Sequence, residues 1–154
     1  GHTITELMVV LLIAGLLAWM ATPGFSALRE AWALRRASGE LLAGLARARL
    51  ESLSRGEAFE LCPADARLRC GARPAVAWTV RAGSSSAGAA PVAVGRLPQG
   101  LTLFANRPAV TYYPWPRAAS TVTLTLCGQL AGERSRRIVV SQAGRPRVEE
   151  TRGC

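Results

Sequence analysis

The first 21 residues limit the fold most strongly, because they form an apolar run with one acid in front of it. Residues 7–21 are fifteen consecutive residues without a charge, and Glu6 directly precedes them. The run is short for a bilayer crossing, which takes about 20 apolar residues, and Pro23 and Gly24 end it. A cleaved signal peptide is the simplest alternative, but such a peptide carries basic residues before its apolar run, and none stands there. A carboxylate at this edge indicates a charge with a functional partner.

The first seven residues, GHTITEL, resemble the N-terminal signature of type IV pilins and type II secretion pseudopilins. In that family a prepilin peptidase cuts after the glycine and methylates the new N-terminus. The resemblance implies that Gly1 ends the leader, that His2 is the mature N-terminus, and that Glu6 pairs with the N-terminal amine of a neighbouring subunit. His2 and Thr5 depart from the family pattern, which has Phe and an aliphatic residue there. Thr3 and Glu6 also fit a local capping box.

Helical periodicity continues after the apolar run. Between residues 25 and 55 Leu and Ala recur every three or four positions among arginines, and Gly56 follows as a C-cap glycine. We expect one long bent helix, with residues 1–24 as its apolar half and an amphipathic half that packs under a globular domain of residues 25–154. The resemblance implies that the apolar half lies in the bacterial inner membrane before assembly and contacts other pilins afterwards, with the domain in the periplasm or on a surface pilus.

Beyond Gly56 the apolar residues have the two-residue period of strands. The strands are separated by turns without intervening helices, so the sheets should be antiparallel. The predicted fold class is therefore α+β, the pilin fold, in which a long N-terminal helix packs on antiparallel sheets. A Gly- and Ser-rich surface loop is expected at residues 83–90. The expected strands are 58–62, 75–81, 92–94, 101–104, 110–113, 121–126 and two in a hairpin within residues 136–148.

Four cysteines behind a membrane-type start indicate an oxidising compartment. Cys62 and Cys70 bracket a turn-rich loop, and we expect a disulfide between them. A metal site is the alternative, but the paired CxxC spacing and a nearby His are missing. Cys127 and Cys154 are expected to form a second disulfide that ties the tail to the sheet, with a free Cys154 as the alternative. We expect neither a metal nor a cofactor.

The C-terminal hairpin is expected to expose a pair of arginines. Residues 142–144 form a three-residue loop, with Gly144 at the position that needs a positive φ. This register places Arg145 and Arg147 on the solvent face, about 6.5–7 Å apart along the strand. The other face carries Ile138, Val140, Pro146 and Val148 and is expected to meet the core. Since Pro146 has no amide to donate, the last strand should lie at a sheet edge.

Gly144-Arg145-Pro146-Arg147 is similar to the G-R-x-R motif of FimT-type minor pilins. Those proteins share the GspH-like pilin fold and bind DNA in natural transformation. The resemblance implies a minor type IV pilin that binds double-stranded DNA non-specifically for uptake. The net charge is +9 and all 19 basic residues are Arg, which suits a polyanion, although GC-rich coding also explains the arginines. The implied DNA-binding residues are Gly144, Arg145, Arg147, Arg137 and Arg136.

Each of these features also has a plainer explanation. Arg145 and Arg147 also suit an ordinary solvated strand face, and Arg136 and Arg137 are placed to form ion pairs with the acids at 149 and 150. The aromatic segment 112–117, YYPWPR, is either edge packing or a platform for base stacking. The alternative function is a structural minor pilin, or a type II secretion pseudopilin, that primes or caps a filament without binding DNA.

An enzymatic activity is not expected. The single His is His2, the single Asp is Asp65, and the chain has neither a P-loop nor a dinucleotide fingerprint. The cutting and methylation of the N-terminus belong to the prepilin peptidase, which is an expected partner.

Overall fold

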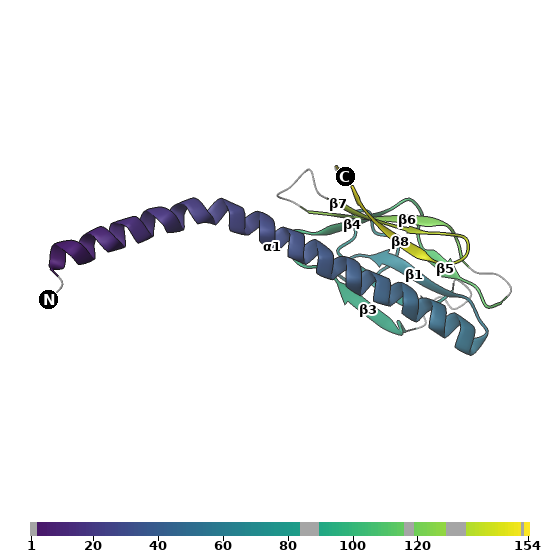
Figure 1. Cartoon of the computed structure of the whole chain (residues 1–154). Helices are drawn as coiled ribbons and strands as arrows, with labels where there is room; N and C mark the ends of the chain where they lie inside the picture. Colours follow the sequence, from purple (N-terminus) through teal and green to yellow (C-terminus); the bar gives the residue numbers. More distant parts are fainter. Residues whose placement is uncertain (1–2, 84–89, 116–118, 129–134, 152) are drawn as a thin grey trace.

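One long helix followed by two antiparallel sheets makes up the protein (Figure 1). This computed structural model describes residues 3–83, 90–115, 119–128, 135–151 and 153–154, apart from the side chains of residues 20–24. The expected loop at 83–90 therefore lies mostly outside the described residues. The α+β pilin fold that the sequence predicted is confirmed. The elements are α1 (Ile4–Arg55), β1 (Phe59–Ala64), β2 (Ala77–Ala82), β3 (Ala93–Arg96), β4 (Thr102–Ala105), β5 (Val110–Tyr112), β6 (Val122–Cys127), β7 (Ser135–Val140) and β8 (Pro146–Thr151).

Helix α1 is continuous and gently bent, as the sequence predicted (Figure 1). It ends at Gly56, which has φ of 67° and donates its N–H to the carbonyl of Ser52 at 3.1 Å. Thr3 is the N-cap, but its side chain makes no capping hydrogen bond, and its hydroxyl lies 3.0 Å from that of Thr5. The hydrogen bond that Thr3 would contribute to the capping box is therefore not formed. No helix in the described part of the chain combines the length and the apolarity needed to cross a membrane.

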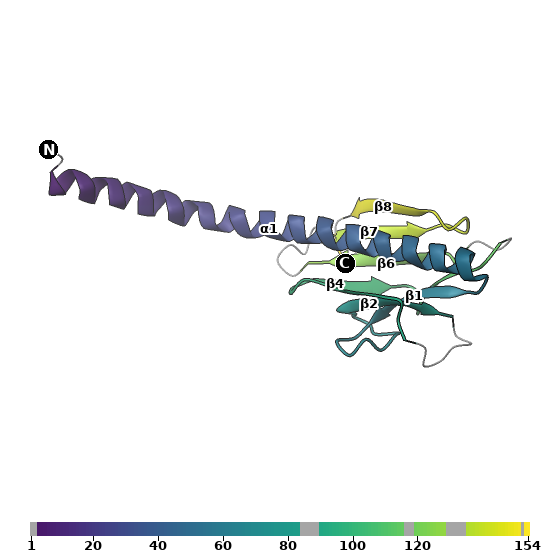
Figure 2. The same ribbon diagram turned by 90° about the horizontal axis from the view of Figure 1, so that it is seen from below.

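Among the described side chains of α1, those that contribute to the hydrophobic core all lie in its C-terminal half, and its N-terminal half projects away from the sheets (Figure 2). The buried side chains of α1 recur every three or four residues, so they form one stripe on the helix. Before this stripe the large apolar side chains are exposed, Leu28 and Trp32 among them. The buried stripe consists of Leu34, Ala37, Leu41, Leu45 and Ala48.

A fragment that begins at Ala27 is expected to be soluble, folded and monomeric. The deletion removes exposed apolar side chains and leaves the buried stripe from Leu34 onward intact. Circular dichroism and sedimentation would check this expectation. A fragment that is unfolded or aggregated at neutral pH would show that the N-terminal half of α1 is needed for folding.

The strands divide into two sheets, with orders β3-β2-β1-β5 and β4-β6-β7-β8. Each strand expected from the alternating pattern is present, with ends shifted by at most three residues. The two sheets are joined where the N–H of Ala75 donates to the carbonyl of Leu103 at 2.9 Å and the N–H of Leu103 donates back at 2.8 Å. Helix α1 packs against strands of both sheets, so the core lies between the helix and the sheets.

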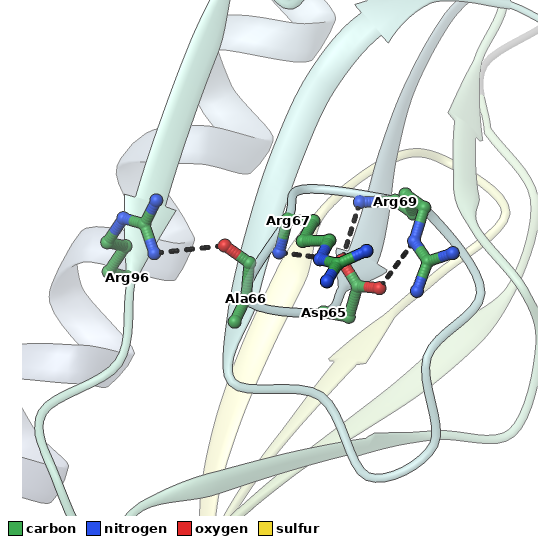
Figure 3. A network of polar contacts seen from close by, with 5 residues as sticks. All are labelled: Asp65, Ala66, Arg67, Arg69 and Arg96. Atoms are coloured by element: carbon green, nitrogen blue, oxygen red, sulfur yellow. Dashed lines mark hydrogen bonds and ion pairs between the residues drawn. The ribbon is translucent and has the colours of Figure 1, made fainter.

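Between β1 and β2 the chain forms a compact loop closed by the disulfide of Cys62 and Cys70. Figure 3 shows the hydrogen bonds that Asp65 accepts within this loop. One carboxylate oxygen of Asp65 accepts the backbone N–H groups of Arg67 and Arg69, both at 2.9 Å. The other accepts Nε of Arg69 at 2.7 Å. The hydrogen bond from the Arg69 backbone is the main reason why the pKa of Asp65 lies below its usual value. A second disulfide joins Cys127 to Cys154.

In protein made in an oxidising compartment, Cys62 and Cys70 are expected to be quantitatively bridged. Their Cα atoms are 5.5 Å apart, within the range that a disulfide spans. Mass spectrometry of an unreduced digest would detect the linked peptides. Because the closed loop is short, its loss should cost about 2 kcal/mol, at the lower end of the usual range. Alkylation of both thiols without prior reduction would contradict the assignment.

Candidate nucleic-acid interface

Strands β7 and β8 form the C-terminal hairpin, in the register that the sequence predicted. Arg137 pairs with Glu149, Val139 with Arg147, and Val140 with Pro146. Strand β8 is the edge strand of its sheet. Side chains of directly opposed residues lie on one face of a sheet, so Arg137 and Arg147 share the outer face as diagonal neighbours. Arg145 immediately precedes β8, and the two-residue period places it on the same face as Arg147.

The turn of the hairpin has a fixed shape. Gly144 has φ of 74°, in the left-handed region, and its N–H donates to the carbonyl of Ser141 at 2.8 Å. The N–H of Ser141 donates to the carbonyl of Arg145 at 3.1 Å. This is the three-residue loop with a glycine at the positive-φ position that the sequence predicted. The turn therefore holds Arg145 at a defined place beside the first residue of β8.

Gly144 is buried because the turn rests on Tyr112 of β5. A Cβ atom at Gly144 would lie 3.1 Å from Cε1 of that ring. Beside it, the N–H of Ala119 donates to the carbonyl of Gln142 at 3.2 Å, and Ala119 bridges Tyr112 in antiparallel fashion. Burial raises the pKa of Tyr112 to about 12, so the ring stays uncharged under the turn. Tyr112 thus serves as edge packing, which was one of the two interpretations of the aromatic segment.

Exposed guanidinium groups without acidic partners occupy the outer face of the hairpin. Arg137, Arg145 and Arg147 are all exposed, and among the described residues no carboxylate lies within ion-pair distance of any of them. Glu149 lies across from Arg137 without forming an ion pair. The exposed charges on this face are therefore available to an external anion.

Arg136 lies on the opposite face, toward α1. Its Nη2 lies 2.5 Å from Oε1 of Glu150, its cross-strand neighbour, and its Nη1 donates to Oγ of Ser38 at 3.1 Å. Of the two ion pairs that the sequence suggested, the one between Arg136 and Glu150 is formed. Arg136 therefore links β7 to α1, and the structure does not bring it together with Arg145 and Arg147. Sequence reasoning missed Ser38, because no local signal marks a helix residue that meets a strand 98 positions later.

The apolar face of the hairpin is covered only on one strand. Ile138 and Val140 are fully buried, whereas Pro146 is exposed and Val148 remains 36% exposed. The expectation that all four residues meet the core is wrong for β8. The reason is that α1 packs on β6 and β7, and β8 lies at the edge beyond them.

The remaining candidate residues are far from the hairpin or outside the described residues. Gly1 and His2 belong to the latter group. Glu6 is exposed in the first turn of α1, at the opposite end of the molecule from the β7–β8 turn (Figure 1). In the part of the chain that the structure describes, no three His, Cys, Asp or Glu residues are grouped so as to hold a metal ion.

Comparison with known proteins agrees with this architecture. Two crystal structures of the type IV minor pilin FimU from Pseudomonas aeruginosa strain PAO1, in space groups P21 and P65, are similar, with TM-scores of 0.60 and 0.58. In each comparison the aligned residues are 23% identical in sequence and cover 75% of this chain. They cover 87% of the FimU chain in the first crystal structure and 92% in the second. At 23% identity, the similarity to FimU shows a shared fold and nothing further. No curated protein matches the sequence.

A family model described as type II transport protein GspH matches residues 37–144. The match includes the second half of α1, both sheets up to the β7–β8 turn, and Gly144, and it ends before Arg145 and Arg147. It therefore covers most of the globular domain. The chain belongs to the GspH family, within the superfamily of type IV minor pilins and pseudopilins.

Proposed function

We propose that this chain is a minor type IV pilin that binds double-stranded DNA without sequence preference, for uptake in natural transformation. The observation that carries the proposal is the exposed group of Arg145, Arg147 and Arg137, which has no acidic partner among the described residues. A duplex presents one phosphate charge per roughly 1.7 Å of its axis. Guanidinium groups about 6.5–7 Å apart on a strand therefore meet more than one phosphate.

The chemistry of arginine supports phosphate as the ligand. Its planar fork donates two parallel hydrogen bonds to phosphate oxygens, and the net charge of +9 favours approach of a polyanion. Gly144 contributes indirectly, because its positive φ and its contact with Tyr112 fix the turn that precedes Arg145. Contacts to phosphate carry no sequence information, so we expect non-specific binding.

The proposed processing, membrane location and assembly of the chain depend on residues 1–24. We propose that the prepilin peptidase processes the chain after Gly1 and that residues 1–24 lie in the inner membrane before assembly. After assembly Glu6 meets the N-terminal amine at His2 of a neighbouring pilin, because a charge in an apolar filament core needs such a partner. The globular domain is then presented in the periplasm or on the cell-surface pilus.

The experiment that tests the proposed function is a gel shift with the full chain in a non-ionic detergent. Two duplexes of equal length and unrelated sequence should bind equally, with a dissociation constant of about 10⁻⁴–10⁻⁶ M at moderate salt. The absence of a shift throughout this range, or a strong preference for one of the duplexes, would contradict the proposal.

Glu149 is expected to weaken DNA binding, and Glu150 is not. Glu149 lies across from Arg137 on the arginine face, whereas Glu150 is held by Arg136 on the face toward α1. Replacing Glu149 with Gln should therefore tighten DNA binding by a few fold, since it removes a charge that repels phosphate. Glu150→Gln should leave DNA affinity unchanged and lower thermal stability. Equal effects of the two replacements on affinity would show that only net charge matters.

A structural role in the filament is the second candidate function. The observation that favours it is the row of exposed large apolar side chains on the N-terminal half of α1, from Ile4 to Trp32, which other pilins are expected to cover. In this role the chain is a minor pilin or type II secretion pseudopilin that primes or caps filament assembly. A chain that enters filaments but binds no DNA would support this candidate.

A further inference from the structure

We infer that Trp115 is a second nucleic-acid contact, which stacks on unpaired bases and makes the domain prefer single-stranded to double-stranded DNA. This inference rests on the proposed function and specifies the form of DNA that the same surface binds best. It arises from two independent features of neighbouring parts of the fold, the hairpin arginines, which form no ion pair among the described residues, and an exposed indole.

The contact between β5 and the hairpin limits how far Trp115 can lie from the arginine turn. The ring of Tyr112, the last residue of β5, lies directly under Gly144. Trp115 follows three residues later, and a chain spans at most about 3.3–3.6 Å per residue. The Cα of Trp115 therefore lies within roughly 11 Å of the Cα of Tyr112. A base on the indole and a phosphate on Arg145 can thus belong to the same short stretch of a strand.

The indole of Trp115 is exposed to solvent and is not part of the hydrophobic core. It is 86% exposed, more than any other large apolar side chain in the described part of the chain. The other tryptophan of the sheet region, Trp78, is 5% exposed. Pro114 and Pro116 flank Trp115 in the sequence, and because proline fixes its own φ and restricts the residue before it, the backbone loses little freedom when a ligand binds.

Stacking distinguishes the two forms of DNA. In a duplex both faces of each base are covered by neighbouring bases, so the indole has access only to strand ends. In a single strand the bases are free to stack on an aromatic ring, and alanine replacement of such a ring weakens binding by about 5- to 160-fold. The arginines contact phosphates of either form, so the single strand gains the contact with Trp115 in addition.

The test compares one labelled oligonucleotide with the duplex made from it, using the full chain in a non-ionic detergent and fluorescence anisotropy. Wild type should bind the single strand more tightly. Trp115→Ala should lower single-strand affinity by about 5- to 160-fold and duplex affinity by less than about twofold. Trp32→Ala is the matched control, because Trp32 is 63% exposed but lies on α1, and it should change neither affinity. Trp115→Phe should retain part of the single-strand preference.

The variants separate failure of this inference from failure of the proposed function. Arg145→Gln with Arg147→Gln should weaken binding of both forms. If this double variant weakens both while Trp115→Ala weakens neither, or weakens both equally, the stacking inference is overturned and the proposed function stands. If wild type binds neither form, the proposed function fails and the inference fails with it. A loss of filament incorporation by Trp115→Ala, with unchanged affinity for the single strand, would overturn the inference and assign Trp115 to a contact between subunits.

Discussion

Replacing both Arg145 and Arg147 with Gln is expected to reduce duplex affinity at low salt by about 100-fold or more, because two charge-assisted hydrogen-bonding groups are lost. Each phosphate contact contributes about −0.9 to the slope of log affinity against log salt concentration. The double variant should therefore lose roughly two units of slope. Both side chains are exposed and form no ion pair among the described residues, so the free energy of unfolding should change by less than about 0.5 kcal/mol.

A control variant that loses two positive charges elsewhere separates the effect of the hairpin position from the effect of net charge. Arg35 and Arg36 are exposed on α1, and Arg36 already pairs with Glu40 at 2.9 Å. Gln at both positions lowers the net charge equally, yet it should leave most of the affinity and the salt slope intact. An unchanged slope in the variant of Arg145 and Arg147, or equal slopes in the two variants, would show that the hairpin arginines are a solvated surface. The structural role in the filament would then be the better account.

The site could be predicted from the sequence where local rules determine the geometry. Gly144 requires a particular turn, the turn sets the register, and the register assigns each side chain of β7 and β8 to a face. For this reason Arg147 and Arg137 appear where the pattern placed them. The same alternation puts Arg136 on the face toward α1, since neighbouring residues of a strand point to opposite sides.

Long-range packing accounts for what the sequence could not show. Nothing in the local pattern indicates that Tyr112 lies under Gly144 or that Ser38 accepts a bond from Arg136. The two sheets also depend on pairings out of chain order, since β5 returns to β1 and β4 joins β6. The turn-separated strands were consistent with several such arrangements, because strand patterns specify faces and not partners.

Strand β1 shows how context overrides a local signal. Proline usually ends a strand because it cannot donate to the ladder, yet β1 continues through Pro63 to Ala64. The carbonyl of Pro63 accepts the N–H of Gly71 at 2.8 Å, so this residue directs its backbone groups away from β2. On that side, in the described part of the chain, β5 pairs with Phe59–Leu61 and not with Pro63. The missing amide therefore costs no bond between strands.

Replacing Gly95 with Ala is expected to destabilise the domain by about 1–3 kcal/mol, the usual cost of overpacking. Trp78 of β2 lies between Gly44 of α1 and Gly95 of β3, and its side chain is almost fully buried. A Cβ at Gly95 would lie 2.2 Å from two ring carbons of Trp78, and one at Gly44 would lie 2.6 Å from another. Because the ring is in contact with a glycine on both sides, it cannot move away from the new methyl group without disturbing α1.

Thermal unfolding followed by circular dichroism checks this expectation, with Gly39→Ala as the matched control. Gly39 is also on α1, but a Cβ there meets nothing within 4 Å. Since Ala is favoured over Gly inside a helix by up to about 1 kcal/mol, the control should raise the melting temperature while Gly95→Ala lowers it. Trp78 and Gly95 belong to the β3-β2-β1-β5 sheet, whereas the arginines lie on the β7–β8 hairpin of the second sheet. The Gly95→Ala variant should therefore bind DNA normally at temperatures where it remains folded. A melting temperature equal to that of wild type would mean that Trp78 does not occupy the space between the two glycines in solution.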